Sequence, residues 1–241
     1  MDGRRIVSAG AGVDPERPGN RVRIFASLTS LGSLAIGTAA RRLVAAGVDG
    51  LHVDIADGHF APFLLFPPAV AWELRDQLGV EVEAHLMVSD PESYIRPLAE
   101  RGIGRIAFHL ESTRHPWRVA SLGRNLGVEM GVAFNPMTSL EVLERLGDAV
   151  DYVNLLGADH DFAGDRLLPA TPNRVRSGRG CAHSGVRVQV DGAVDAENAG
   201  SLISAGADDL VVGRAVCDAT NWSAAIAAIR VEIAGALERK P

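Results

Sequence analysis

From residue 21 onward the sequence alternates short runs rich in β-branched residues with longer amphipathic stretches, and this repeat constrains the fold more than any other feature. We expect eight strands, whose first residues lie about 27 positions apart on average, the length of one strand plus one helix. The expected strands cover residues 22–28, 50–55, 81–86, 104–109, 129–134, 150–154, 186–191 and 208–212.

The stretches between the expected strands predict helices, because small or leucine-rich faces recur along them. Several of these stretches end in glycine where a helix would stop, at Gly47, Gly79, Gly102, Gly147 and Gly206. Parallel strands joined by helices form either an open doubly wound sheet or a closed barrel. The open sheet predicts a glycine-rich dinucleotide loop after the first strand, and ASLTSLGS contains no G-x-G-x-x-G. The count of eight and the length favour an α/β fold with a single TIM (β/α)8 barrel over residues 21–241, preceded by a flexible N-terminal extension at 1–20.

One repeat is irregular. Between the sixth and seventh expected strands lie two prolines, several glycines and an arginine-rich segment, residues 166–179, with only a weak apolar period. A mobile loop with a frayed helix and a lid that orders over a ligand both fit this composition, and the role of the arginines is left open.

Charge and composition exclude several classes of protein. The chain has 24 lysines and arginines against 30 aspartates and glutamates, a net charge of −6, which argues against a nucleic-acid partner. No apolar run approaches the length of a membrane span, and the N-terminus lacks the apolar core of a secretory signal, so we expect no membrane partner. The two cysteines, Cys181 and Cys217, cannot build a disulfide framework and suit a reducing compartment. We therefore expect a cytoplasmic protein.

Polar residues close several of the expected strands, where a TIM barrel carries its catalytic side chains: His52 with Asp54, His85, His109 and Asp191. His52 and Asp54 share one face of their strand, because alternate residues point the same way. Two imidazoles and two carboxylates converging at the barrel mouth would suit one divalent metal ion, with Zn, Fe, Mn or Co favoured over Ca. The alternative is that each residue is a hydrogen-bonded packing residue, although burying all four without a partner is costly.

Five segments together resemble the ribulose-phosphate 3-epimerase family and its relatives, including hexulose-phosphate 3-epimerases: LHVDIADGHFAP, EAHLMVSDPESYI, FHLES, FNPMT and VQVDGAVDAENAGSLISAGADDLVVG. The resemblance covers residues 22–217 and implies a TIM barrel with one divalent metal bound by His52, Asp54, His85 and Asp191. It also implies that Asp54 and Asp191 are the catalytic acid/base pair, which inverts C3 of a ketose phosphate through an enediolate. A small-molecule sugar phosphate is the implied partner, and a homo-oligomer the implied assembly.

The resemblance further implies substrate-binding roles for Ser27, His85 and Met87, and phosphate binding through backbone N–H groups at Gly192 and Gly213. Arg214 follows Gly213 where the family usually has a small polar residue. It either restores a phosphate clamp through bidentate contacts or is a surface arginine, and both alternatives stay open.

Other positions depart from the family pattern. Ala56 and Leu156 stand where the family usually has methionine, Phe63 where it has asparagine, and Ala193 where it has a second glycine. The sixth loop carries Asp159, Asp161 and Asp165, whose charges would repel a phosphate. These departures bear on which substrate fits, while the expected metal and acid/base set is intact.

The leading prediction is therefore a metal-dependent 3-epimerase acting on ribulose 5-phosphate and xylulose 5-phosphate or on a related ketose phosphate. The alternatives are an epimerase-like barrel with a changed substrate, either a non-phosphorylated sugar or one of a specialised pathway, and a non-catalytic sugar-binding barrel. A rival class is a metal-free decarboxylase or aldol-type phosphate barrel, which often uses an Asp-x-Lys-x-x-Asp run or a Schiff-base lysine. The chain has no such run, and because Lys240 is its sole lysine a Schiff-base mechanism is nearly excluded.

Overall fold

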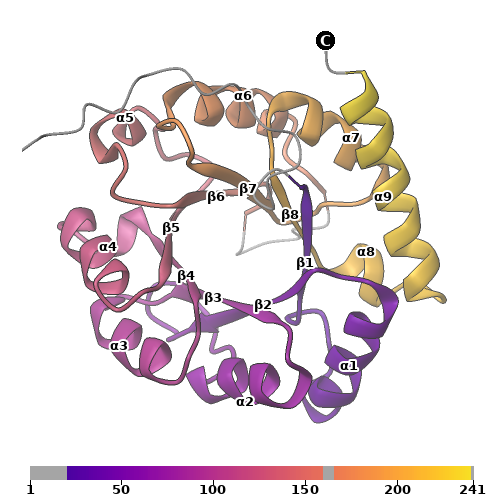
Figure 1. Ribbon diagram of the computed structural model, residues 1–241, viewed down its shortest axis with the longest axis horizontal. Helices are drawn as coiled ribbons and strands as arrows, with labels where there is room; N and C mark the ends of the chain where they lie inside the picture. The colour runs from indigo at the N-terminus through magenta and orange to yellow at the C-terminus, as the bar shows by residue number, and fades with distance from the viewer. Residues whose placement is uncertain (1–20, 160–165, 240–241) are drawn as a thin grey trace, which may run out of the picture.

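The computed structural model describes residues 21–159 and 166–239. Its eight parallel strands pair in chain order, and β8 pairs with β1 to close the barrel. Helices surround this ring of strands (Figure 1). The prediction of a single TIM barrel is confirmed, whereas the predicted extension at 1–20 lies outside the described residues.

The strands are β1 (Arg23–Ser27), β2 (Gly50–Ala56), β3 (Glu81–Met87), β4 (Arg105–His109), β5 (Glu129–Phe134), β6 (Tyr152–Leu156), β7 (Arg187–Asp191) and β8 (Asp209–Val212). The α-helices are α1 (Ile36–Ala46), α2 (Pro68–Leu78), α3 (Glu92–Glu100), α4 (Pro116–Arg124), α5 (Val142–Leu146), α6 (Thr171–Cys181), α7 (Ala196–Ala205), α8 (Arg214–Cys217) and α9 (Trp222–Glu238). Two short 3-10 helices, η1 (Ser33–Ala35) and η2 (Leu110–Ser112), follow β1 and β4.

The strand predictions agree with the structure to within one residue except at β6, which begins and ends two residues later than expected. Asp151 explains the later start. Its N–H donates to the carbonyl of Met130 at 2.8 Å, and its carboxylate accepts from the N–H of Met130 at 2.8 Å. Asp151 therefore caps the entry to β6 with its side chain, and regular strand pairing begins at Tyr152.

Glycine ends several of the helices as predicted. Gly47 after α1 and Gly206 after α7 have φ values of 100° and 114°, in the left-handed region that favours glycine. At the start of α7, Asp195 accepts the N–H of Asn198, and the Asn198 side chain accepts the N–H of Asp195. This reciprocal cap fixes the turn that follows β7 and its terminal Asp191.

The arginine-rich segment forms helix α6, with Val175 and Gly178 buried against the barrel. Thr171–Cys181 is a continuous helix, and the two interpretations of the segment, a frayed helix or a lid, stay open. Arg174 donates to the carbonyls of Asn135 and Thr138 at 3.1 and 3.0 Å, and Arg179 donates to the carbonyl of Val186 at 2.8 Å. These two arginines thus tie neighbouring loops to the helix. The preceding residues 160–165, with Asp161 and Asp165, lie outside the described part of the chain.

Charged side chains fill the lower part of the barrel interior, toward the amino ends of the strands. Arg105 on β4 is 1% exposed and donates to Glu83 on β3 and Asp209 on β8, each at 3.1 Å. Its guanidinium carbon lies 3.5 Å from the ring centroid of Tyr152, whose hydroxyl donates to Glu83 at 3.1 Å. Every buried charge in this group has a partner, as a water-poor interior requires.

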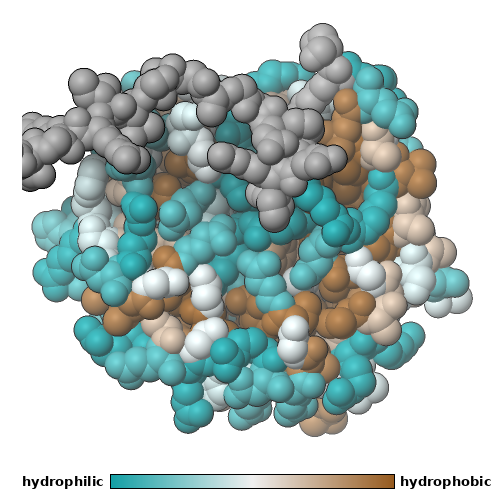
Figure 2. Space-filling view, viewed as in Figure 1, coloured by the Kyte–Doolittle hydropathy of each residue, from teal (hydrophilic) through white to brown (hydrophobic). Residues whose placement is uncertain are grey.

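No helix within the described residues is both long and apolar enough to cross a membrane. Hydrophilic residues cover much of the face seen in Figure 2, with hydrophobic colour both on the side occupied by α9 and across the lower part of the view. Val231 and Leu237 on α9 are 68% and 44% exposed.

Candidate active site and metal centre

The four predicted metal ligands meet inside the carboxyl end of the barrel. His52 and Asp54 lie on β2, and strand pairing places His85 on β3 beside Asp54. Asp191 ends β7, on the other side of β1 and β8. All four side chains are buried, and one ligand atom from each lies within 4.8 Å of the others.

The distances between these atoms match those expected around one small cation. His52 Nε2 and His85 Nδ1 lie 3.0 and 2.9 Å from Asp54 Oδ1. The same nitrogens lie 3.3 and 3.5 Å from Asp191 Oδ2. Ligand atoms about 2.1 Å from a tetrahedral zinc ion are roughly 3.4 Å apart, so the spacing and the N/O donor set fit a divalent transition metal.

The electrostatics of the cluster also favour a cation. Burial opposes ionisation of Asp54 and Asp191, but the neighbouring His52 outweighs this effect and lowers the pKa of both carboxyls, that of Asp54 strongly. Burial likewise opposes protonation of His52, yet the carboxylates of Asp54, Asp191 and Glu83 hold its pKa well above the usual value. The cluster therefore contains two ionised carboxylates that need positive charge beside them.

Hydrogen bonds outside the cluster orient the two aspartates. Ser27 donates to Asp54 Oδ2 at 3.0 Å, which leaves Oδ1 directed toward the histidines. Asn154 on β6 donates to Asp191 Oδ2 at 3.4 Å. Ser27, for which a substrate-binding role is predicted, thus contacts Asp54, while Asn154 was not predicted from the sequence.

A pocket of about 970 Å³ opens above the cluster and exposes Asp54 and Asp191 on its wall. His52 and His85 lie beneath them and are 0% exposed, so they can hold a metal while the aspartates face a ligand. The structure places the predicted substrate-binding residues Ser27, Met87, Gly192, Gly213 and Arg214 along the same pocket. His85 is the one predicted substrate contact that does not line it.

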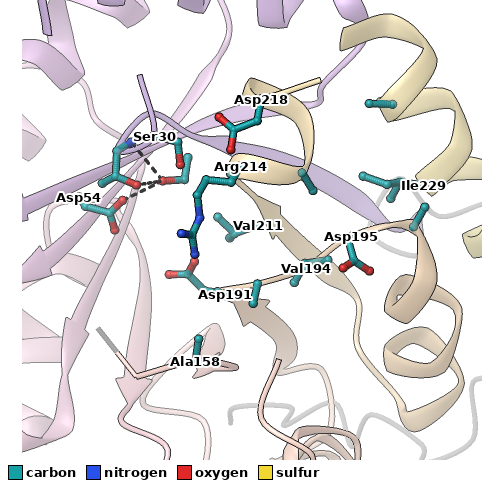
Figure 3. Close-up of a pocket in the computed structure, with 18 of the residues that line it drawn as sticks. Ser30, Asp54, Ala158, Asp191, Val194, Asp195, Val211, Arg214, Asp218 and Ile229 are labelled. Atoms are coloured by element: carbon teal, nitrogen blue, oxygen red, sulfur yellow. Dashed lines mark hydrogen bonds between the residues drawn. The ribbon is translucent and has the colours of Figure 1, made fainter. Parts of the chain in front are cut away.

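The pocket wall carries one cationic side chain among several acids. Arg214 begins α8 and extends toward Asp191 (Figure 3). It is the only lysine or arginine among the described lining residues, which also include Asp159, Asp195, Glu197 and Asp218. Arg214 lines the pocket and is also an exposed residue, so both of its sequence interpretations stay open.

Backbone conformation shapes the loop after β7. Gly192 has a φ of 102°, and a Cβ placed there would lie 3.2 Å from the backbone nitrogen of Ala158. The next residue, Ala193, has a φ of 54°, the one non-glycine residue with positive φ in the described chain. Alanine in this left-handed conformation is strained, and the loop keeps it at the phosphate end of the predicted site.

An apolar wall completes the pocket. Met87 is 1% exposed and packs in a small cluster with Ala56 and Ala61, flanked by Phe60, Phe63 and Leu65. The departures at Ala56 and Phe63 therefore lie together, where they change the shape of one wall of the pocket.

Two glutamates near the cluster were not predicted. Glu83 Oε1 lies 3.6 Å from His52 Nδ1, and Glu111 Oε2 lies 3.2 Å from His109 Nδ1. His109 in turn contacts His85, with 2.9 Å between their Nε2 atoms. The alternation of β3 offered a signal for Glu83, since it precedes His85 by two residues and shares its face.

The fold and this cluster define a (β/α)8 barrel with a candidate divalent-metal centre below a ligand pocket. The model of the "Ribulose-phosphate 3 epimerase family" matches residues 23–217. A ribulose-phosphate 3-epimerase of Bacillus subtilis is 30% identical over 87% of this chain and 98% of its own length. That of Escherichia coli K12 is 32% identical over 88% of this chain and 96% of its own. The chain therefore belongs to the ribulose-phosphate 3-epimerase family, whose curated members are carbohydrate isomerases, as predicted.

Solved structures of lower identity share the fold. Orotidine 5'-phosphate decarboxylase from Pyrococcus horikoshii superposes with a TM-score of 0.67 at 18% identity, covering 88% of this chain and 99% of that one. KGPDC from Streptococcus mutans superposes with a TM-score of 0.69 at 15% identity, covering 89% and 98%. At these identities the likeness shows the barrel alone.

Proposed function

We propose that this protein is a metal-dependent ketose-phosphate 3-epimerase, with ribulose 5-phosphate and xylulose 5-phosphate as its leading substrate pair. The observation that carries the proposal is the placement of Asp54 and Asp191. Both carboxylates reach the pocket wall while sharing one cluster of metal-ligating atoms with His52 and His85. Family membership supports the same reaction.

The two aspartates supply a base and an acid on different sides of the pocket. Asp54 comes from β2 and Asp191 from β7, with β1 and β8 between them in the barrel. In the proposed reaction one carboxylate removes the proton from C3, and the other, after taking up a proton from solvent, donates it to the opposite face. The direction of the reaction decides which aspartate has which role, so the two are assigned jointly.

His52, Asp54, His85 and Asp191 would hold the metal through the four atoms measured above. A divalent ion bound there would stabilise the negative charge that develops on the substrate oxygens when C3 loses its proton. Zn, Fe, Mn and Co all suit this donor set. Ser27 and Asn154 keep the carboxylates oriented, since each donates to one oxygen of an aspartate.

The phosphate end of the substrate is proposed to lie by Gly192, Gly213 and Arg214. A Cβ on Gly213 would lie 3.3 Å from Ser30 Oγ, so a glycine here leaves room for a ligand to approach the backbone. Arg214 offers a guanidinium for bidentate phosphate contacts. Its charge offsets the repulsion from the acidic residues on the same wall.

Turnover by the zinc-loaded protein tests the proposal. We expect conversion of ribulose 5-phosphate to xylulose 5-phosphate, followed by ¹³C NMR at C3, and a loss of turnover of at least about a hundredfold in both Asp54→Asn and Asp191→Asn. The matched control is Glu197→Gln, which removes a carboxylate of the same pocket outside the ligand cluster and should retain turnover. Full activity in either cluster variant contradicts the assigned acid/base roles.

The acidic pocket wall also supports an epimerase with a changed substrate. Asp159, Asp195, Glu197 and Asp218 would suit a non-phosphorylated sugar better than a doubly charged phosphate. Ribulose and related free ketoses belong in the same assay. Higher kcat/KM for a free ketose identifies this alternative, and binding of sugars without turnover identifies a non-catalytic sugar-binding barrel.

A homo-oligomer and a cytoplasmic location stay predictions. Exposed apolar side chains at Leu34, Leu64 and Met137, which are 106%, 77% and 94% exposed, support association between copies. Light scattering on the purified protein measures the mass of the particle and decides between a monomer and an oligomer.

A further inference from the structure

Each histidine of the metal cluster directs one ring nitrogen toward the ligand atoms and the other away from them. His52 uses Nε2 toward Asp54 and Asp191, so its Nδ1 points down the barrel. His85 uses Nδ1 toward the same carboxylates, so its Nε2 points outward. A neutral imidazole can bind a metal through one nitrogen only when the proton sits on the other, so the two histidines need opposite tautomers.

Glu83 faces the outer nitrogen of His52. Nδ1 of His52 is buried and makes no hydrogen bond to any described residue, and Glu83 Oε1 lies 3.6 Å from it. Glu83 accepts from Arg105 at 3.1 Å, Gln189 at 2.7 Å and Tyr152 at 3.1 Å. The buried carboxylate meets only donors, one of them the Arg105 guanidinium, so the hydrogen bonds favour its ionised form. An ionised carboxylate accepts but cannot donate, so it favours a proton on Nδ1 of His52.

Glu111 acts on the ring proton of His85 indirectly, through His109. Its carboxylate accepts the backbone N–H of Asn135 at 2.9 Å and a bond from the Thr138 hydroxyl, and it lies 3.2 Å from His109 Nδ1. Despite partial burial, the bonds from His109 and Thr138 lower the pKa of Glu111 to about 2. With a proton on His109 Nδ1, His109 Nε2 accepts from His85 Nε2 at 2.9 Å. The chain of donors then leaves Nδ1 of His85 free of its proton.

We propose that Glu83 and Glu111 are positioning residues that set the tautomers of the two metal-ligating histidines, Glu83 acting directly on His52 and Glu111 acting on His85 through His109. Glu83 thereby presents the lone pair of His52 Nε2 to the metal, and Glu111 that of His85 Nδ1. The inference rests on the metal centre of the proposed function. It does not depend on which sugar is the substrate.

Substitution of Glu83 by glutamine tests the direct half of this inference. In Glu83→Gln the amide can donate to His52 Nδ1, which moves the ring proton to Nε2 and blocks the ligand lone pair. We expect the Zn²⁺ affinity, measured by competition with a chromophoric chelator, to fall about 10- to 100-fold. Long-range ¹H–¹⁵N correlation spectra of the zinc-free protein at alkaline pH should show His52 change from the Nδ1–H to the Nε2–H tautomer. Glu83→Asp keeps an acceptor-only group and should retain the original tautomer.

Asp209→Asn is the matched control, because Asp209 also accepts from Arg105 within the barrel but does not contact either histidine. It should change the Zn²⁺ affinity less than about threefold and leave the spectra of His52 and His85 unchanged. An effect on zinc as large as that of Glu83→Gln would show that general loss of buried charge is responsible, and would overturn the inference.

Glu111→Gln tests the second half at a more exposed position, where the side chain is 24% exposed and folding is less at risk. We expect about tenfold weaker Zn²⁺ binding and an altered His85 tautomer. Unchanged zinc affinity together with unchanged tautomers in the folded glutamine variants refutes the inference. Both readouts are independent of turnover, so an inactive protein with the predicted zinc and NMR changes would refute the epimerase proposal and keep this one.

Discussion

Replacement of Arg105 by methionine should be among the most damaging single changes to the stability of this barrel. The guanidinium is 1% exposed and contacts Glu83, Asp209 and Glu129, with the Tyr152 ring against its face. Methionine fills much of the same space without the charge. The substitution therefore tests the electrostatic contribution more than the packing.

The magnitude follows from which carboxylate loses its partner. Asp209 keeps two arginines, since Arg23 and Arg187 also donate to it. Glu83 keeps only the neutral donors Tyr152 and Gln189 and the nearby His52. Leaving one buried charge without its pair costs about 3–5 kcal/mol, so we expect a loss of that size. Adding Glu83→Gln removes the stranded charge. The loss in free energy of unfolding of the double variant should therefore be about 1–3 kcal/mol smaller than the sum of the losses in the two single variants.

Urea unfolding of the chelator-treated protein measures these values, with circular dichroism and tryptophan fluorescence followed together to show that the transition is two-state. Equal slopes of free energy against urea would confirm that the variants differ in stability rather than in compactness. A loss below about 1 kcal/mol for Arg105→Met, or strict additivity in the double variant, would refute the reasoning about the buried pair.

Three further predictions concern the pocket and its loops. Ala193→Gly should relieve the left-handed strain and raise the free energy of unfolding by about 0.5–1 kcal/mol, measured by urea titration; a destabilised variant would show that the alanine is not strained. Although its slight burial opposes the shift, N–H groups of Ser89, Phe60 and His59 hold the pKa of Asp57 at about 2, below its unfolded value near 3.9. The stability that this carboxylate contributes should be present above about pH 4 and lost as the pH falls toward 2. The melting temperatures of the wild type and Asp57→Asn should therefore converge between about pH 4 and pH 2. A constant difference between them would contradict the prediction. Arg214→Met should lower kcat/KM at least about tenfold for ribulose 5-phosphate but not for ribulose, and equal losses for both would exclude a phosphate contact.

The barrel could be predicted from the sequence because the signals for its strands and helices are local and repeat along the chain. Each βα unit carries its own alternation, and glycines such as Gly47 and Gly206 mark helix ends through backbone conformation alone. The convergence of the four candidate metal ligands was predictable for the same reason, since parallel strands bring their terminal residues to one end. The start of β6 was misplaced because it depends on a side-chain cap by Asp151, which the alternation of β-branched residues does not encode.

The supporting residues depend on contacts between distant strands, and that explains why they were missed. Asn154 orients Asp191 from a neighbouring strand, 37 residues earlier in the chain. Glu83 has the same alternation signal as His85, but its meaning becomes apparent only when Arg105, Gln189 and His52 surround it. In the sequence, a carboxylate within a buried barrel strand looks out of place. In the structure, it has defined hydrogen-bond partners.

The structure shows where the loop residues that depart from the family pattern lie. Ala193 retains the left-handed turn that glycine would adopt more easily, and Arg214 faces a pocket wall otherwise rich in carboxylates. These changes surround the predicted phosphate end and leave the ligand cluster intact. They bear on the choice of sugar, whereas the proposed chemistry at C3 assigns the acid/base roles to Asp54 and Asp191.

The fate of the C3 hydrogen in deuterated water tests the central claim most directly. With zinc-loaded protein and ribulose 5-phosphate, two carboxylates on opposite faces predict that the first xylulose 5-phosphate formed carries solvent deuterium at C3, while the unreacted substrate keeps its hydrogen. Proton NMR and mass spectrometry during the first turnovers measure both. Product that retains the substrate's C3 hydrogen would contradict the two-base account, and the absence of C3 exchange in every ketose phosphate tried would contradict the epimerase itself.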